Sequence, residues 1–178
     1  GFNMRQRFFQ KVRRTVAAGL LAAWCLGGCA SAAGNLPILM DHDLTIDKND
    51  TDSMTITDER FRLDMEFLQE FGYTTLLSQD LVDIRQGSAT MPEKPVMITF
   101  DDGYRSNYEL AYPVLQQTGM RAVIAVIARN IRTQEQASAT RGSMTWEELR
   151  EMVSTGMVEV GSHTFNLHNA SYGGNLSP

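Results

Sequence analysis

From residue 36 onward, short apolar runs alternate with longer stretches in which apolar residues recur every three or four positions. The apolar runs are rich in β-branched residues and are typical of strands buried on both faces, as in a parallel sheet. Strands are expected at residues 36–40, 73–77, 96–100, 121–128 and 157–161. The amphipathic stretches predict helices at residues 57–71, 78–87, 106–118 and 145–156. Strand and helix alternating at this spacing predict an α/β protein with a parallel sheet or a (β/α) barrel.

Capping residues and apolar stripes support the predicted helices. The first helix presents one apolar stripe, made of Phe61, Met65, Leu68 and Phe71. Ser78 is expected to cap the second helix, and Thr145 with Glu148 forms a capping box for the last. Pro113 predicts a first turn or a kink in the third helix. The polar stretch 45–52 is predicted to be a loop.

The central apolar run, Val96 to Phe100, ends abruptly in Asp101, Asp102 and Gly103. In α/β folds the carboxyl ends of the strands form the rim where chemistry takes place. Successive strand side chains point to opposite faces, so both carboxylates face one mouth only if the backbone leaves strand geometry, which Gly103 permits. A turn would account for the Asp-Gly pair, but it would leave Asp101 unexplained.

A second polar cluster, containing His163 and His168, follows the predicted strand 157–161. Imidazole is the commonest metal ligand, and two of them beside one carboxylate suit zinc or a neighbouring divalent ion. Residues five apart lie about 140° apart on an α-helix, so this pair could share an ion only from an irregular loop. Two unrelated loop histidines are the alternative, but the paired aspartates in the same chain favour a joint site.

Charge is unevenly distributed along the 178 residues, a length suited to about one domain. The composition, 43% hydrophobic and 21% charged, is that of a globular protein. The five charged residues before Cys29 are all basic, and removing them from the 16 basic residues leaves 11 against 21 acidic ones. An acidic body of this kind repels nucleic acid, so we exclude a nucleic-acid partner.

Residues 1–28 resemble a bacterial lipoprotein signal peptide. A basic stretch precedes the apolar run Thr15–Leu26, which is too short for an ordinary transmembrane helix, and Leu26-Gly27-Gly28-Cys29 resembles a lipobox. By this resemblance Cys29 is lipidated and residues 29–35 form a short tether. The body is then exported to the cell envelope and anchored to the membrane outside the cytoplasm. A plain secretory signal is the alternative, and it also predicts export.

Thr99-Phe100-Asp101-Asp102-Gly103, followed by Gly161-Ser162-His163-Thr164, resembles the motifs of the polysaccharide deacetylase family, carbohydrate esterase family 4. The resemblance runs from about Leu36 to His168. It implies a distorted (β/α) barrel that hydrolyses N-acetyl groups of an N-acetylglucosamine-containing polysaccharide, either poly-N-acetylglucosamine or peptidoglycan. The interval between the two histidines is one residue longer than the commoner form, and a similar spacing occurs in the branch that acts on poly-N-acetylglucosamine.

The same resemblance implies roles for individual residues. Asp101 is the general base, and Asp102, His163 and His168 hold a divalent metal, with zinc expected and cobalt or nickel as alternatives. Such an ion polarises the amide carbonyl and activates water, while a free carboxylate accepts the water proton. A backbone N–H near Tyr104 is expected to stabilise the oxyanion, and the Tyr104 side chain is a candidate substrate-groove residue.

Two departures from the family are visible. Nothing after His168 matches the later motifs, which supply an arginine that orients the base and a histidine acid. Residues 36–178 are therefore expected to be the N-terminal part of a catalytic domain, with the C-terminal part of the barrel missing and the fragment alone inactive. Asp41 stands where the family usually has an aromatic residue. Asp41-His42-Asp43 is interpreted as a polar strand-end turn, with contact to the site or to a second ion as the alternative.

Two other functional classes stay open at this point. One is a catalytically inactive glycan-binding protein of the cell envelope with the same fold. The other is an iron oxygenase, because two histidines and one carboxylate also bind non-haem iron. The spare Asp101 and the βα pattern speak against the oxygenase.

Overall fold

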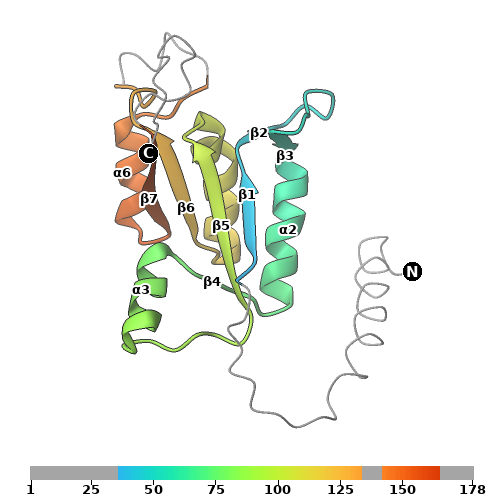
Figure 1. The fold of residues 1–178 in the computed structure, drawn as a ribbon. Helices are drawn as coiled ribbons and strands as arrows, with labels where there is room; N and C mark the ends of the chain where they lie inside the picture. Colours follow the sequence, from blue (N-terminus) through green and yellow to red (C-terminus); the bar gives the residue numbers. More distant parts are fainter. Residues whose placement is uncertain (1–35, 134–141, 165–178) are drawn as a thin grey trace, which may run out of the picture. The chain divides into compact units, whose positions relative to one another are not determined.

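The computed structural model describes residues 36–133 and 142–164, all of which belong to the unit Leu36–Pro178 (Figure 1). The predicted signal peptide, the tether, Cys29 and His168 lie outside these residues. Within the described ranges, every helix is too short or too polar to cross a membrane.

A parallel five-stranded sheet forms the centre of the described unit (Figure 1). Its main path is β1–β5–β6–β7, and the short β4 also pairs with β5. The strands are β1 (Ile38–Asp41), β4 (Thr74–Thr75), β5 (Pro95–Asp102), β6 (Ala122–Ile127) and β7 (Val158–Thr164). The pairings of β5 with β1, β4 and β6 and of β6 with β7 are parallel, as predicted, so the carboxyl ends of the strands meet at one edge.

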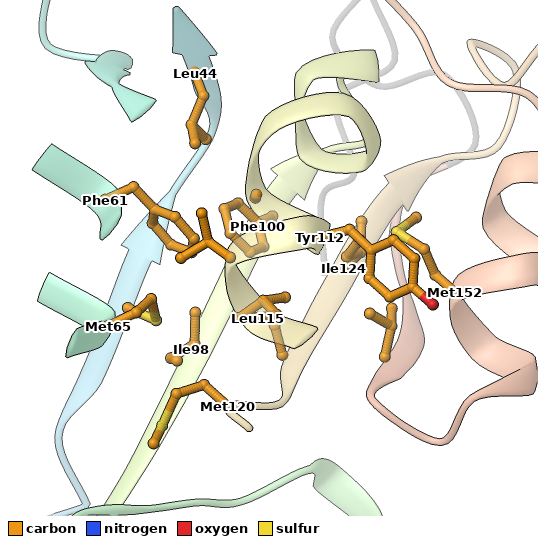
Figure 2. Packing of buried hydrophobic residues seen from close by; sticks show 14 of the residues in the cluster. Leu44, Phe61, Met65, Ile98, Phe100, Tyr112, Leu115, Met120, Ile124 and Met152 are labelled. Carbon is orange, nitrogen blue, oxygen red and sulfur yellow. The ribbon is translucent and has the colours of Figure 1, made fainter. Parts of the chain in front are cut away.

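Most helices cover one face of this sheet. They are α2 (Asp58–Glu70), η1 (Asn107–Ala111), α4 (Tyr112–Thr118) and α6 (Trp146–Ser154). Their apolar side chains form the main core with alternate residues of β5 and β6, and Figure 2 shows Phe61 and Met65 facing Ile98 and Phe100. The rings of Phe61 and Phe100, both fully buried, lie 5.4 Å apart. This burial fixes which face of β5 is covered.

The opposite face of the sheet carries a smaller cluster. Met97 and Val123 pack there against Leu77 and Leu81, which places α3 (Ser78–Gln86) on that side. Because side chains alternate along a strand, Asp101 lies on the same face as Met97, away from the main core. This face is covered only in part among the described residues.

Several local features differ from the predictions. The stretch 45–52, expected to be a polar loop, lies between two short strands that the sequence did not predict and shares only Thr45 with them. These strands, β2 (Asp43–Thr45) and β3 (Thr55–Thr57), form a small parallel pair. Ser78 is the first helical residue of α3 and not its cap; Asp80 instead accepts a hydrogen bond from the Leu77 N–H. The Thr145–Glu148 capping box is confirmed.

The third predicted helix begins with a wide π turn. In η1 the Tyr112 N–H donates to the carbonyl of Asn107, five residues earlier, and α4 continues from Tyr112. Pro113 lacks an N–H and its ring would clash with the carbonyl four residues before it in an α-helix. A wider turn relieves that clash, so the irregularity expected at Pro113 takes the form of a π turn.

Candidate functional site

The site lies where β5 ends. Side chains alternate between the two faces of β5 as far as Asp101. The next two residues have positive φ values, 72° at Asp102 and 79° at Gly103. The backbone therefore leaves strand geometry at Asp102 itself, one residue before the glycine at which the sequence predicted the change. Two successive left-handed residues turn both carboxylates toward the same edge of the sheet.

Gly103 is required at this turn for two reasons. Its positive φ is unfavourable for a residue with a side chain. A Cβ added there would also lie 2.9 Å from Ile131 Cδ1 and 3.3 Å from Val126 Cγ1. The tight approach of β6 and the Ile131 loop thus fixes the position of the two aspartates.

His163 reaches the aspartates from a β-bulge in β7. Ser162 pairs with Val126 and Thr164 pairs with Ile127, which leaves His163 as the extra residue in the register. Its Nε2 lies 3.5 Å from Asp101 Oδ2 and 4.0 Å from Asp102 Oδ1. The sequence placed His163 in a loop after a strand ending at Gly161; it is instead within the strand, and the bulge redirects its side chain.

His42 also belongs to the site. It is the single residue between β1 and β2, and its Nε2 lies 3.9 Å from Asp101 Oδ2. The side chains of His42 and Asp101 are 13% and 18% exposed, so this contact is largely shielded from solvent. The interpretation of Asp41-His42-Asp43 as a strand-end turn outside the site is therefore wrong for His42.

His42 could have been found from the sequence. It follows the predicted strand 36–40 in the same way that Asp101 follows the central strand. In a parallel sheet both positions lie on one rim. What the sequence does not contain is that β1 and β5 are neighbours, with Asp41 paired to Phe100.

The described side chains fit part of a metal site. Asp102 Oδ1 is buried and lacks a hydrogen-bond partner, as expected of an oxygen reserved for an ion. Two donors that each lie about 2.0–2.2 Å from one zinc ion are at most about 4.4 Å apart, and Asp102 Oδ1 and His163 Nε2 satisfy this limit. Within residues 36–133 and 142–164 there is no cluster of three or more ligand side chains, and the third predicted ligand, His168, lies outside them.

The surroundings of the site are acidic. The pKa of the half-buried Tyr104 phenol is raised, first by burial and then by the carboxylates of Asp102, Asp43 and Asp52. Its hydroxyl group therefore stays protonated at neutral pH and remains a hydrogen-bond donor near the mouth. The structure places Tyr104 beside the site without testing a role in a substrate groove.

Comparison with known proteins identifies the family. Residues 88–177, just over half of the chain, match the family described as polysaccharide deacetylase. The chain belongs to this polysaccharide deacetylase family. The fold prediction is confirmed as well, because solved deacetylase structures resemble this parallel sheet with its helices.

Three relatives illustrate the similarity. The Bacillus subtilis protein YxkH is 34% identical over 131 residues, which cover 74% of this chain and 43% of that protein. The poly-β-1,6-N-acetyl-D-glucosamine N-deacetylase of Escherichia coli K12 is 30% identical over 148 residues, or 77% of this chain and 22% of that enzyme. The structure of a de-N-acetylase from Aggregatibacter actinomycetemcomitans superposes with a TM-score of 0.66 at 30% identity, covering 75% of this chain and 56% of that one. The present chain thus spans less than half the length of the first two relatives.

Proposed function

We propose that the protein containing this chain is a metal-dependent deacetylase that removes N-acetyl groups from an N-acetylglucosamine polysaccharide and releases acetate. The observation that carries the proposal is the convergence of Asp101, Asp102 and His163 at the end of β5. Family membership supports it, and metal dependence is general in the family. Neither the glycan-binding alternative nor the iron oxygenase gains support from a particular feature of the site.

Asp102, His163 and His168 would hold the ion. One carboxylate oxygen and two imidazole nitrogens are a donor set that suits zinc, with cobalt or nickel as alternatives. When bound, such an ion polarises the amide carbonyl and makes water a better nucleophile. The other groups proposed to take part in the reaction are side chains of this chain.

Asp101 is proposed as the general base. Its Oδ2 faces His163 Nε2 at 3.5 Å but is not needed as a ligand, so it remains available to accept a proton. As water oxygen bonds to the amide carbon, one water proton passes to this carboxylate. The shielded position of Asp101 strengthens its interaction with the reacting water.

His42 is proposed as the proton donor to the leaving amine. Breaking the carbon–nitrogen bond releases acetate and a sugar amine, and the departing nitrogen needs a proton. Imidazole exchanges protons near neutral pH, and His42 Nε2 lies 3.9 Å from Asp101 Oδ2 at the same mouth. The sequence had assigned this step to motifs beyond His168, whereas the geometry favours a residue of the described chain.

Poly-β-1,6-N-acetylglucosamine is the proposed substrate. The E. coli relative at 30% identity carries this substrate in its name, and the long interval from His163 to His168 is the spacing noted for that branch. Peptidoglycan is the alternative. Acetate release from β-1,6-linked and β-1,4-linked N-acetylglucosamine oligomers separates the two.

We also propose that the protein acts in the cell envelope. Residues 1–28 would be the signal peptide, Cys29 would carry the lipid and residues 29–35 would link it to the catalytic unit. The test is labelled fatty-acid incorporation, which should disappear in Cys29→Ser. Persistent incorporation in that variant would contradict the lipobox.

The activity is tested with the zinc-loaded full-length protein and β-1,6-linked oligomers. Wild type should release acetate, and Asp101→Asn should lose about 10²–10⁴-fold in kcat while retaining zinc. Asp83→Asn is a matched control, because this α3 carboxylate accepts a hydrogen bond from Gln79 at the protein surface and is not among the groups of the site. Oligomer binding without acetate release by the wild type would instead favour the glycan-binding alternative.

A further inference from the structure

Residues 42–44, which lead from the end of β1 into β2, are held by two polar side chains from the segment that follows Asp102. Asn107 Nδ2 donates to the carbonyl of His42 at 2.8 Å. Ser106 Oγ donates to Asp43 Oδ1 and accepts from the Leu44 N–H at 3.0 Å. Residues 42, 43 and 44 are thus bound to Ser106 and Asn107, which follow β5.

These bonds act where the strand ladder stops. The last pair between β1 and β5 is Asp41 with Phe100, so His42 lies just beyond the backbone pairing of the main sheet. After His42 the chain enters β2, where Leu44 is buried in the main core (Figure 2). Besides the contact of His42 with Asp101, the side chains of Ser106 and Asn107 therefore tie residues 42–44 to the segment that follows β5.

Asn107 is unusual for a residue devoted to packing. It is 1% exposed, and its Oδ1 has no hydrogen-bond partner. It also opens the π turn, since its own carbonyl accepts from the Tyr112 N–H. A buried amide that satisfies only part of its hydrogen-bonding capacity is retained against an apolar alternative when its remaining bond has a use.

We propose that Ser106 and Asn107 are positioning residues that hold the His42 imidazole beside Asp101. This inference rests on the proposed function, in which Asp101 takes a proton from water and His42 gives one to the amine. Through these two residues the same short segment fixes both groups. It continues directly from Asp101 and Asp102, and it binds the carbonyl of His42 itself and the two residues that follow it. A displacement of about 1 Å in such an arrangement costs about 10²-fold in rate.

The first readout needs no activity. Histidine is ¹³C-labelled in the zinc-loaded full-length protein, and the ring signal of His42 is assigned by its loss in His42→Ala. Asn107→Ala and Ser106→Ala should each shift or broaden the His42 signal and leave the His163 signal in place. Thr118→Val is the matched control, since Thr118 is a buried polar residue of the adjoining helix α4 whose hydroxyl donates to the carbonyls of Val114 and Leu115.

The second readout is kinetic. Asn107→Ala should lower kcat about 10- to 100-fold with KM within about twofold, because it misplaces a proton donor and not the substrate. The same substitution should have less than about a twofold effect in a His42→Ala background, whereas a general structural defect would lower kcat in both. Ser106→Ala, at a more exposed position, carries the test if Asn107→Ala does not fold.

An unchanged His42 signal in a folded Asn107→Ala or Ser106→Ala variant would overturn the positioning role. An equal loss of kcat with and without His42 would also overturn it. If the wild type releases no acetate, the proposed function fails, and the histidine signals still decide whether Ser106 and Asn107 hold His42.

Discussion

At the scale of single residues, Asp102 combines two unfavourable features. Its left-handed backbone costs about 1–2 kcal/mol for a residue with a side chain, and its buried, unpaired Oδ1 costs about 1–3 kcal/mol. His163 Nε2, 4.0 Å from this oxygen, is too far away to be a hydrogen-bond partner. A carboxylate kept under such conditions is explained by a function such as metal binding, for which strain is commonly retained.

Replacing Asp102 by Gly or by Ala separates these two costs. Both variants remove the carboxylate, but only Gly also relieves the backbone. We expect metal-free Asp102→Gly to have a free energy of unfolding about 1 kcal/mol above that of Asp102→Ala. Urea unfolding in the presence of a chelator measures the difference, and equal stability would show that residue 102 is not strained. Neither variant should release acetate.

Asp41 is predicted to make stability depend on pH. Its pKa is raised, first by burial and then by Asp64, while His42 and Arg60 oppose the rise. The folded protein therefore binds a proton more tightly than the unfolded chain, so the free energy of unfolding falls as pH rises from the unfolded pKa through the higher folded pKa.

Asp41→Asn should abolish this dependence. The side chain lines a cavity of about 370 Å³ between β1 and α2, so the amide fits without new contacts. The variant should be more stable than wild type at pH 7, and the gain should shrink as the pH approaches 4. Thermal melts from pH 4 to 8 check this, with Asp83→Asn as control. A gain that is constant with pH would contradict the charge-based explanation.

The chemistry of individual residues could be predicted better than their surroundings. Asp101, Asp102 and His163 stand out in the sequence, and the structure brings them together. His42 was misjudged because its partner Asp101 is set by the pairing of β1 with β5, which no local pattern encodes. Whether the three ligands hold zinc stays a prediction.

At the scale of elements, apolar runs and caps were sufficient to locate the helices and the main strands. The β2–β3 pair was missed because its residues are mostly polar and its order depends on hydrogen bonds such as Asp52 Oδ1 accepting from the Met54 and Thr55 N–H groups. The bulge in β7 was missed for a similar reason. It is a property of the register between two strands, not of either strand alone.

Gly103, after β5, and Gly87, at the C-terminal end of α3, give a matched pair of substitutions. Gly103 and Gly87 have φ values of 79° and 78°, but a Cβ at Gly87 would have no atom within 4 Å. Gly87→Ala should therefore cost only the backbone term, about 1–2 kcal/mol, whereas Gly103→Ala should add about 1–3 kcal/mol of overpacking against Ile131 and Val126. Chemical denaturation measures both. Equal costs would mean that the loop at Ile131 moves aside freely.

At the scale of the whole molecule, the parallel sheet explains why the site forms at all. His42 follows β1, the two aspartates end β5 and His163 lies near the end of β7. The parallel order brings the carboxyl ends of these strands to one edge. The fold class was predictable because alternating strands and helices admit few architectures. The identity of neighbouring strands was not, since it depends on packing between segments that are distant in the chain.

Metal binding should accordingly couple the ends of separate strands and stabilise the folded protein. An ion that binds only the folded state at a concentration 100 times its Kd adds about 2.7 kcal/mol to the free energy of unfolding. Removing the metal from the full-length protein with a chelator should lower its Tm, and added zinc should restore it. Asp101→Asn should keep this response, because Asp101 is proposed as the base and not as a ligand.

His168→Ala is the decisive variant of this series. Water does not replace a missing imidazole at equal strength, so the variant should lose zinc on dialysis and show no zinc-dependent rise in Tm. Asp102→Asn should behave in the same way, whereas Asp83→Asn should respond like the wild type. If His168→Ala retains zinc and its Tm shift, the ion is held without that residue. His42, whose Nε2 lies 3.9 Å from Asp101 Oδ2, is then the imidazole to test as a replacement ligand.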